Sequence, residues 1–316
     1  MLSRLLILLC IFASCPSYAG LRINDLSTGT NNIDFNNWTG SGNATINVDF
    51  CVTSVLGNTQ QSTTTAPYEI KLRTRGGNAS ASIPFQLEPS SGAGQAIPLT
   101  VTYSDLIANS SEQLGINIYT AQDKTGAIIQ CPSGLNARLR FVINQADLAS
   151  SAAGSYRSLL RITARGGDSG TERAVRNISL NIDIDDIVQL QGLDDLLLGN
   201  YSGTGDVSAS EDFCIYRNGS DRYQVTARGS GDGGAFTLLN NDNEIPYSLE
   251  WDDSSVVTPM LANSNLTQRQ NASLNTNDCE SGTSNARINI DLRQTDLAAS
   301  PAGNYRGILT LIIAPE

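Results

Sequence analysis

Six cysteines and the absence of histidine limit the chemistry open to this 316-residue sequence. A chain without histidine has no Ser-His-Asp triad, no Cys-His nucleophile pair and no histidine-ligated metal. Residues 167–170 (Gly-Asp-Ser-Gly) resemble a stretch around a nucleophilic serine, but no histidine base accompanies them. Residues 229–234 fit the G-x-G-x-x-G pattern, yet Phe236 begins another strand where a dinucleotide site requires a helix. Both segments predict turns, and we expect neither an enzyme nor a cofactor.

The charge balance is acidic, with a formal net charge of −11. A chain with no basic excess cannot neutralise many phosphates, so we expect no nucleic-acid partner. The acidic clusters at 183–186, 194–195 and 252–253 lack the spacing of a calcium loop. We interpret them as solvated charges of loops and linkers, and predict no metal site. A glycosidase that uses two such carboxylates stays open as an alternative, because the sequence does not show their separation in space.

Residues 1–19 have the organisation of a secretory signal peptide. Arg4 provides a positive charge, residues 5–13 form an apolar run, and residues 17–19 (Ser-Tyr-Ala) form a cleavage site. Lipoprotein processing at Cys15 is the alternative. We therefore expect a secreted protein that has lost the first two of its six cysteines.

An internal repeat runs through the rest of the sequence. The matching blocks keep the same order, and each repeat contains one early and one late cysteine. The blocks are residues 38–51 with 201–214, 68–76 with 223–229, 97–103 with 245–251, 131 with 279, 136–138 with 285–287, and 147–157 with 296–306.

The repeat indicates how the four remaining cysteines pair. An exported chain with an even number of cysteines is expected to form disulfides. Pairing within each repeat, Cys51 with Cys131 and Cys214 with Cys279, is the simplest symmetric answer. Loops of this length would stabilise the protein by about 4 kcal/mol each in the chain-entropy model.

Short alternating segments separated by polar turns predict strands throughout both repeats. Residues 45–50 and 68–73 alternate apolar and polar side chains with period two. Residues 144–153 and 293–302 could each form a short helical turn. The pattern predicts an all-β fold of two tandem immunoglobulin-like β-sandwiches.

The two repeats differ in their last strand. The N-terminal domain, residues 20–187, ends with residues 177–185, whose apolar side chains alternate; the C-terminal domain, residues 188–316, shows no counterpart after residues 305–313. A sandwich that lacks its last strand leaves unpaired backbone groups, which a strand from another chain can satisfy. A smaller, closed sandwich is the alternative. We expect a polymerisation groove formed by Phe213, Tyr305, Leu309, Leu311 and Ile313.

Three features resemble the spore coat protein U family, which includes subunits of archaic, Csu-type chaperone–usher pili. They are the Gly-rich start with Asp-Phe-Cys, the late cysteine, and the closing Ala-Gly-x-Tyr-Arg strand at 153–157 and 302–306. The two-domain arrangement looks like the tip adhesin of such pili. The resemblance implies a periplasmic pilus chaperone, an outer-membrane usher, and linkage of the second domain to the next pilus subunit through its donor strand. It also implies that the first domain is the adhesive tip on the cell surface, although no motif there matches a known binding site.

A contact surface of the first domain should lie at the end away from the linker, which we place near residues 186–196. Counting alternating strands places residues 165–172, 76–80 and 104–135 at that end, and residues 55–56 nearer the linker. Apolar side chains in connecting segments can form an exposed contact patch, although most could instead belong to an extra strand packed in the core. The candidates are Ile107, Leu114, Ile116, Tyr119, Ile128 and Ile129.

Two functions fit the sequence best. One is a pilus tip adhesin that attaches to a host or abiotic surface and supports biofilm formation. The other is a structural tip or initiator subunit with no ligand of its own. A secreted monomeric carbohydrate-binding module is a third function, and it requires the second domain to fold alone.

Overall fold

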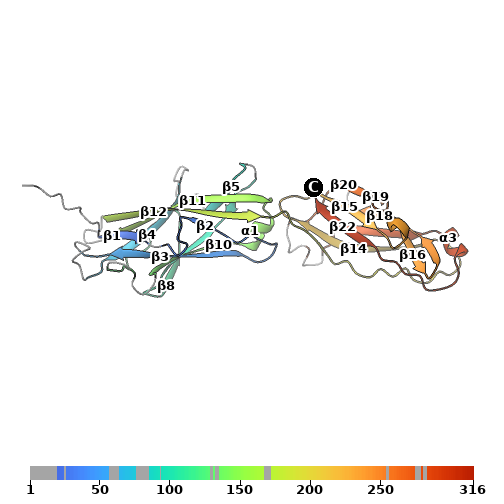
Figure 1. Cartoon of the computed structure of the whole chain (residues 1–316), viewed down its shortest axis with the longest axis horizontal. Coiled ribbons are helices and arrows are strands. Elements are labelled where there is room, and N and C mark those ends of the chain that lie inside the picture. Colours follow the sequence, from blue (N-terminus) through green and yellow to red (C-terminus); the bar gives the residue numbers. More distant parts are fainter. Residues whose placement is uncertain are drawn as a thin grey trace, which may run out of the picture.

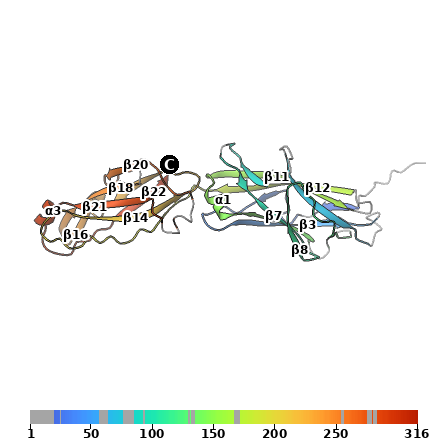
Figure 2. The ribbon, with the colours of Figure 1, turned by 180° about the vertical axis from the view of Figure 1, so that it is seen from behind.

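The computed structural model describes residues 20–24, 26–56, 64–75, 85–92, 94–128, 131, 135–166, 172–253, 256–274, 279 and 283–316. Figure 1 shows two β-rich halves arranged end to end, and Figure 2 shows the same arrangement from behind. The predicted all-β, two-domain fold is confirmed. The expected signal peptide lies outside the described residues. Within them, no helix has the length and apolar character needed to cross a membrane.

The first domain contains two main sheets. One has the order β1-β3-β10-β7-β8 and the other the order β2-β12-β11-β4-β9, with β5 and β6 attached to β11. The strands of the first sheet are β1 (Leu21–Asn24), β3 (Ala44–Ser54), β7 (Thr100–Asp105), β8 (Ser110–Gln113) and β10 (Ala137–Ile143). The others are β2 (Asn32–Asp34), β4 (Pro67–Thr74), β5 (Gln86–Pro89), β6 (Ile97–Pro98), β9 (Lys124–Thr125), β11 (Gly154–Gly166) and β12 (Glu172–Ile184).

Period-two alternation explains why these segments form half-buried strands. In β10, Leu139 and Phe141 are buried in the core, whereas Arg138 and Arg140 lie on the other face. The Arg138 guanidinium makes two hydrogen bonds to the Asp49 carboxylate on the neighbouring strand β3, at 2.6 and 2.8 Å.

The second domain repeats this plan with fewer strands. Its main sheet has the order β13-β14-β21-β18-β19, and smaller sheets have the orders β20-β15-β22 and β16-β17. The strands are β13 (Val188–Gln191), β14 (Val207–Arg217), β15 (Tyr223–Arg228), β16 (Thr237–Asn240), β17 (Asn243–Pro246), β18 (Ser248–Asp252), β19 (Val257–Met260), β20 (Asn265–Arg269), β21 (Ala286–Leu292) and β22 (Thr310–Pro315). The described helices are α1 (Gln145–Ala149), α3 (Gln294–Ala299) and the 3-10 turn η1 (Asp232–Gly234).

Equivalent residues take equivalent places in the two domains. The backbone N–H of Val52 donates to Asn136 Oδ1 at 2.8 Å, and that of Ile215 donates to Asn285 Oδ1 at 2.8 Å. Disulfides join Cys51 to Cys131 and Cys214 to Cys279, the pairing that the repeat suggests. Helices α1 and α3 occupy the two segments for which the sequence predicts a helical turn. The repeat in the sequence is therefore a repeat in the structure.

Candidate functional site

Strand β12 completes the first domain by lying between two other strands. It pairs antiparallel with β11 over residues 154–166 and parallel with β2, where Leu180 faces Ile33. Its inward side chains, which alternate along the strand, are all buried: Ile178, Leu180, Ile182 and Ile184. This single strand therefore pairs with the backbone of β11 and β2 and also covers the core.

In the second domain, β22 holds the place that β11 holds in the first. Thr226 of β15 faces Ile312 of β22, as Lys71 of β4 faces Thr163 of β11. Along the described part of the chain, no strand pairs with the opposite edge of β22. Leu311 is consequently only half-buried, whereas its counterpart in the first domain is fully buried.

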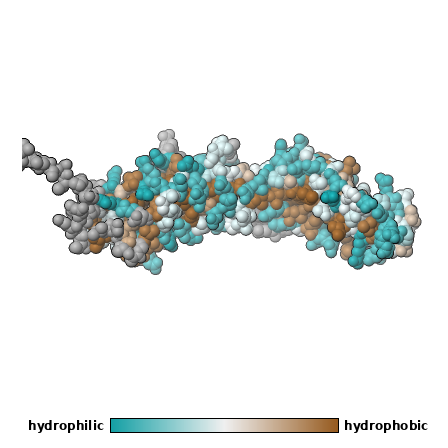
Figure 3. All heavy atoms as spheres, viewed as in Figure 1, coloured by the Kyte–Doolittle hydropathy of each residue, from teal (hydrophilic) through white to brown (hydrophobic). Residues whose placement is uncertain are grey.

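The facing wall of the opening is an extended segment, residues 194–200. Leu196 and Leu198 pack partly buried against the second core, and Leu197 between them is 87% exposed. Leu196 corresponds to Ile33 of β2 in the first domain. This segment forms no strand because the strand with which it would pair is missing from the described residues. We call the space between residues 194–200 and β22 the groove, and Figure 3 shows hydrophobic atoms gathered along this part of the molecule.

One end of the groove widens into a cavity of about 970 Å³. Its lining includes Leu198, Tyr201, Leu238, Ile245 and Tyr305. The Tyr201 hydroxyl is buried and has no hydrogen-bond partner within the described structure. A buried polar group without a partner is rare in proteins, and the backbone of an added strand could supply the missing bond.

The same place in the first domain is closed. Ile184 of β12 forms a β-bridge with Trp38, and Ile182 lies opposite Tyr156. Trp38 and Tyr156 are the repeat counterparts of the two tyrosines that border the cavity. The cavity thus corresponds to the space that the last residues of β12 occupy in the first domain.

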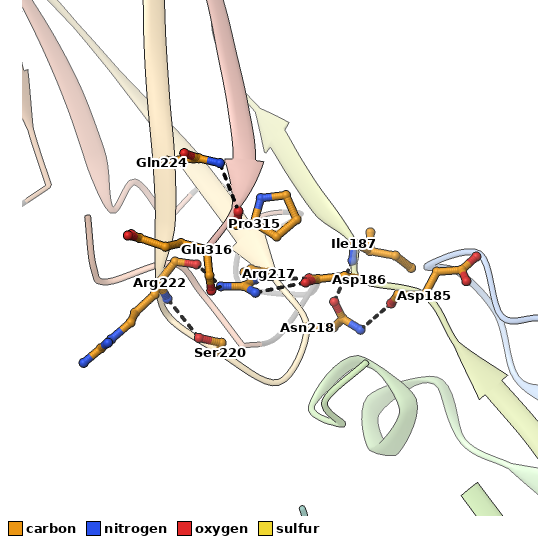
Figure 4. Close-up of polar contacts among 10 residues, drawn as sticks. All are labelled: Asp185, Asp186, Ile187, Arg217, Asn218, Ser220, Arg222, Gln224, Pro315 and Glu316. Carbon is orange, nitrogen blue, oxygen red and sulfur yellow. Dashed lines mark hydrogen bonds and ion pairs between the residues drawn. The ribbon is translucent and has the colours of Figure 1, made fainter. Parts of the chain in front are cut away.

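Arg217 fixes the linker-proximal end of β22 (Figure 4). Its guanidinium donates two hydrogen bonds to the Asp186 carboxylate, at 3.1 and 3.0 Å. It also donates to the backbone carbonyls of Glu316, at 2.6 Å, and of Arg222. Arg217 is buried, so these bonds satisfy a cation that has little access to water. One side chain therefore ties the linker to the strand that borders the groove.

Two further contacts hold the domains together. The Asn218 side-chain amide donates to the carbonyl of Asp185 at 2.8 Å and accepts from the N–H of Ile187 at 2.7 Å (Figure 4). The Tyr216 hydroxyl donates to the carbonyl of Ala149, in α1, at 3.0 Å. Burial raises the pKa of the Tyr216 phenol, which keeps it protonated as a donor.

No protein-family model matches the chain, and no curated protein matches it. Three similar solved structures come from bacterial pili. The CsuC–CsuE chaperone–tip subunit complex of the archaic Csu pili of Acinetobacter baumannii is 12% identical, with 89% of this chain and 96% of that chain covered and a TM-score of 0.45. CfaE, the adhesive subunit of CFA/I fimbria of enterotoxigenic Escherichia coli, is 14% identical, with coverages of 90% and 92% and a TM-score of 0.33. The CupB6 tip adhesin of Pseudomonas aeruginosa is 10% identical, with coverages of 87% and 88% and a TM-score of 0.35.

These similar structures are pilus tip proteins. Their low identities limit the likeness to the fold.

The structure separates the expected groove residues into two groups. Tyr305, Leu309, Leu311 and Ile313 are half-buried at or beside the open edge. Phe213 is not at the open edge. It lies inside the second core, with its ring 5.3 Å from that of Trp251, because the register of β14 turns it inward.

The expected contact residues of the first domain divide in the same way. Ile107 is 56% exposed, and Ile128 is exposed as well. Leu114 and Ile116 are buried, so the prediction that they are exposed is wrong. They follow the extra strand β8 and pack into the core, which agrees with the alternative hypothesis. Tyr119 is half-buried, and Ile129 lies outside the described residues.

The strand count misplaces residues 55–56 of the first domain. Val55 bonds to Gly20 and bridges Thr65 at the end away from the linker, not near it. The N–H of Arg75 donates to Leu159, midway along β11, so the chain there runs toward the linker. Strands β4 and β5 are both antiparallel to β11, so they run in the same direction and break the alternation on which the count depended. Residues 76–80 themselves lie outside the described part.

Three residues at the groove were not predicted from the sequence. The wall residues Leu196 and Leu198 could have been found by extending the repeat, since they align with Ile33 and Phe35. Arg217 has no such signal, because its counterpart is Ser54 and its partners come from the linker and β22. Among the described residues, no group of His, Cys, Asp and Glu is arranged to hold a metal ion.

Proposed function

We propose that this chain is an exported pilus subunit whose second domain is completed by a strand from another protein. The open edge of β22, with Leu311 half-buried where its counterpart is fully buried, is the observation that supports it. Unpaired edge strands invite pairing with another strand, and β-strand addition is a recurrent mode of recognition. The sequence resemblance suggests a pilus chaperone as the first donor, an outer-membrane usher for export, and the next pilus subunit as the final donor.

Strand β12 indicates which pattern of side chains the donated strand should have. It places a large apolar side chain at every second position from Ile178 to Ile184, with polar residues between them. A donor with this alternation would cover Leu309, Leu311 and Ile313, and its end would enter the cavity beside Tyr201 and Tyr305. Its backbone would pair with β22 on one side and residues 194–200 on the other.

A synthetic peptide with the sequence of residues 176–185 tests this function in the full chain. We expect calorimetry to show two unfolding transitions, one for each domain. The peptide should raise the melting temperature of the second domain only, because ligand binding to the folded state stabilises that state. The closed first domain is the internal control. A matched peptide with serine at the Leu180 and Ile182 positions should have no effect. Equal effects of both peptides, or no effect of either, would contradict the proposal.

Attachment to a surface through the first domain is the second part of the proposed function. Leu56, Leu106, Ile107 and Ile128 are exposed apolar side chains near the end away from the linker. Such side chains can contact a host or abiotic surface and support biofilm formation. Ile107→Asp should leave pili assembled but reduce attachment, whereas a structural tip without a ligand would attach normally.

A further inference from the structure

The outer face of the first domain concentrates positive charge in an otherwise acidic protein. We define the basic face as Lys71, Arg73, Arg75, Arg161, Arg165 and Arg173, all on or next to β4, β11 and β12. These side chains alternate with buried core residues such as Ile70, Leu72 and Ile162, so the pleat directs them outward. Glu69 is bonded to Arg165, and it is the one acidic residue in the described segments 68–75, 159–166 and 173–177. Glu172, the first residue of β12, precedes Arg173.

Strand register brings like charges directly opposite each other on this face. Arg161 faces Arg73 across β11 and β4, and Arg165 faces Arg173 across β11 and β12. Like charges in directly opposite positions destabilise a sheet. Within the described part of the chain, Arg73 and Arg173 have no acidic partner that would offset this cost.

Lys71 lies close to other positive charges. Burial and then the charges of Arg73, Arg173 and Arg165 lower the pKa of its ammonium group. Lys71 and Arg165 also lie over the ring of Tyr119, at 4.4 and 4.3 Å from its centre. These cation–π contacts hold two of the cations in place on the face.

The second domain shows that the fold does not require this charge. The repeat places Thr226 where Lys71 stands, Thr310 where Arg161 stands, and Ala314 where Arg165 stands. An arginine remains at the position of Arg73, where the second domain has Arg228, opposite Thr310. The basic face is thus a property of the first domain alone.

We propose that the basic face binds a linear acidic polysaccharide. Arginine supplies five of the six cations, and the planar guanidinium fork matches carboxylate and sulfate groups with paired hydrogen bonds. The two arginine pairs are four residues apart along β11, a spacing of about 13 Å, so anionic groups that recur along an extended chain can engage both. The proposal does not depend on the groove or on a donated strand.

Nucleic acid fits this face less well than a polysaccharide does. The net negative charge of the chain repels a long, stiff polyanion that extends beyond the face. Tyr119, the aromatic ring on the face, is already engaged by Lys71 and Arg165 and cannot serve as a platform for bases.

Binding of the full chain to heparin oligosaccharides and to polygalacturonate tests the proposal. The variant Arg73→Gln/Arg161→Gln should bind at least one of these probes about tenfold more weakly, and wild-type binding should weaken between about 50 and 150 mM NaCl as ionic screening increases. The matched control Arg140→Gln/Arg293→Gln removes the same charge from exposed positions elsewhere, and should change affinity less than about twofold.

Thermal unfolding checks that the variant proteins fold, which we expect because the changed side chains lie on the surface. Removing one arginine pair should leave the melting temperature unchanged or raise it. Failure of the wild type to bind either probe would overturn the proposal, as would equal losses in the variant and the control. Tighter binding to double-stranded DNA or to phosphatidylglycerol vesicles than to both polysaccharides would also overturn it.

Discussion

Strands β11 and β22 hold the same place in two copies of one fold, yet one is enclosed and the other is not. β11 has β4 on one side and β12 on the other, whereas in the described chain β22 pairs with β15 alone. The core residue Ile162 of β11 is fully buried, and its counterpart Leu311 is half-buried. Similar apolar strands therefore give a closed domain or an open one according to whether a further strand lies beside them.

Matched truncations should expose this difference most strongly. Ile162→Ala removes fully buried atoms and should destabilise the first domain by about 3 kcal/mol. Leu311→Ala should lower the free energy of unfolding of the second domain by only about 1 kcal/mol, because water already reaches part of that side chain. Calorimetry of the two unfolding transitions measures both. Equal costs would show that the groove is no more open than the corresponding part of the first domain.

The same pair of variants sharpens the comparison when the groove is filled. With the β12-derived peptide bound, the cost of Leu311→Ala should approach that of Ile162→Ala, because the peptide excludes water from the strand edge. A cost that stays the same in the presence of bound peptide would place the peptide elsewhere.

Arg217→Met should have an intermediate effect that is confined to the second domain. The change removes the ion pair with Asp186 and the bonds to two backbone carbonyls, and should cost about 2 kcal/mol. Hydrogen exchange should then rise at the linker and at the end of β22 together. The control Arg222→Met alters a side chain of the same loop that points away from this cluster in Figure 4, and should leave exchange unchanged.

Loss of a surface ion pair should have the smallest effect. Hydrogen bonds from Arg287 lower the pKa of Asp212, and the pair corresponds to Arg138 and Asp49 in the first domain. A lowered folded-state pKa gives stability that is present above the ordinary aspartate pKa of about 3.9 and is lost as the pH falls through the folded value. Asp212→Asn should therefore lower the second melting temperature slightly at pH 7, with the difference from wild type disappearing in acid. A difference that persists at low pH would mean that charge is not its cause.

Much of the fold could be predicted because local patterns and the repeat agree. Alternation marks the strands, and the repeat positions of Cys51, Cys131, Cys214 and Cys279 indicate their partners. The site was less accessible to prediction. The open edge could be inferred from the repeat, but the inward direction of Phe213 depends on the register of β14, which local alternation does not fix. The burial of Leu114 and Ile116 depends on β8, which is too short and polar to give a strand signal.

The all-β composition, the duplicated plan and the difference in the last strand follow from the order of residues along the chain, because period-two alternation and repeated motifs are properties of that order. Which surfaces face one another depends on how the chain folds in three dimensions. Folding places Arg217 between the linker and β22, and it brings six cations from three separate segments onto one sheet face. Strand pairing between distant segments creates these neighbourhoods, and the pairing register depends on long-range contacts that no local pattern contains.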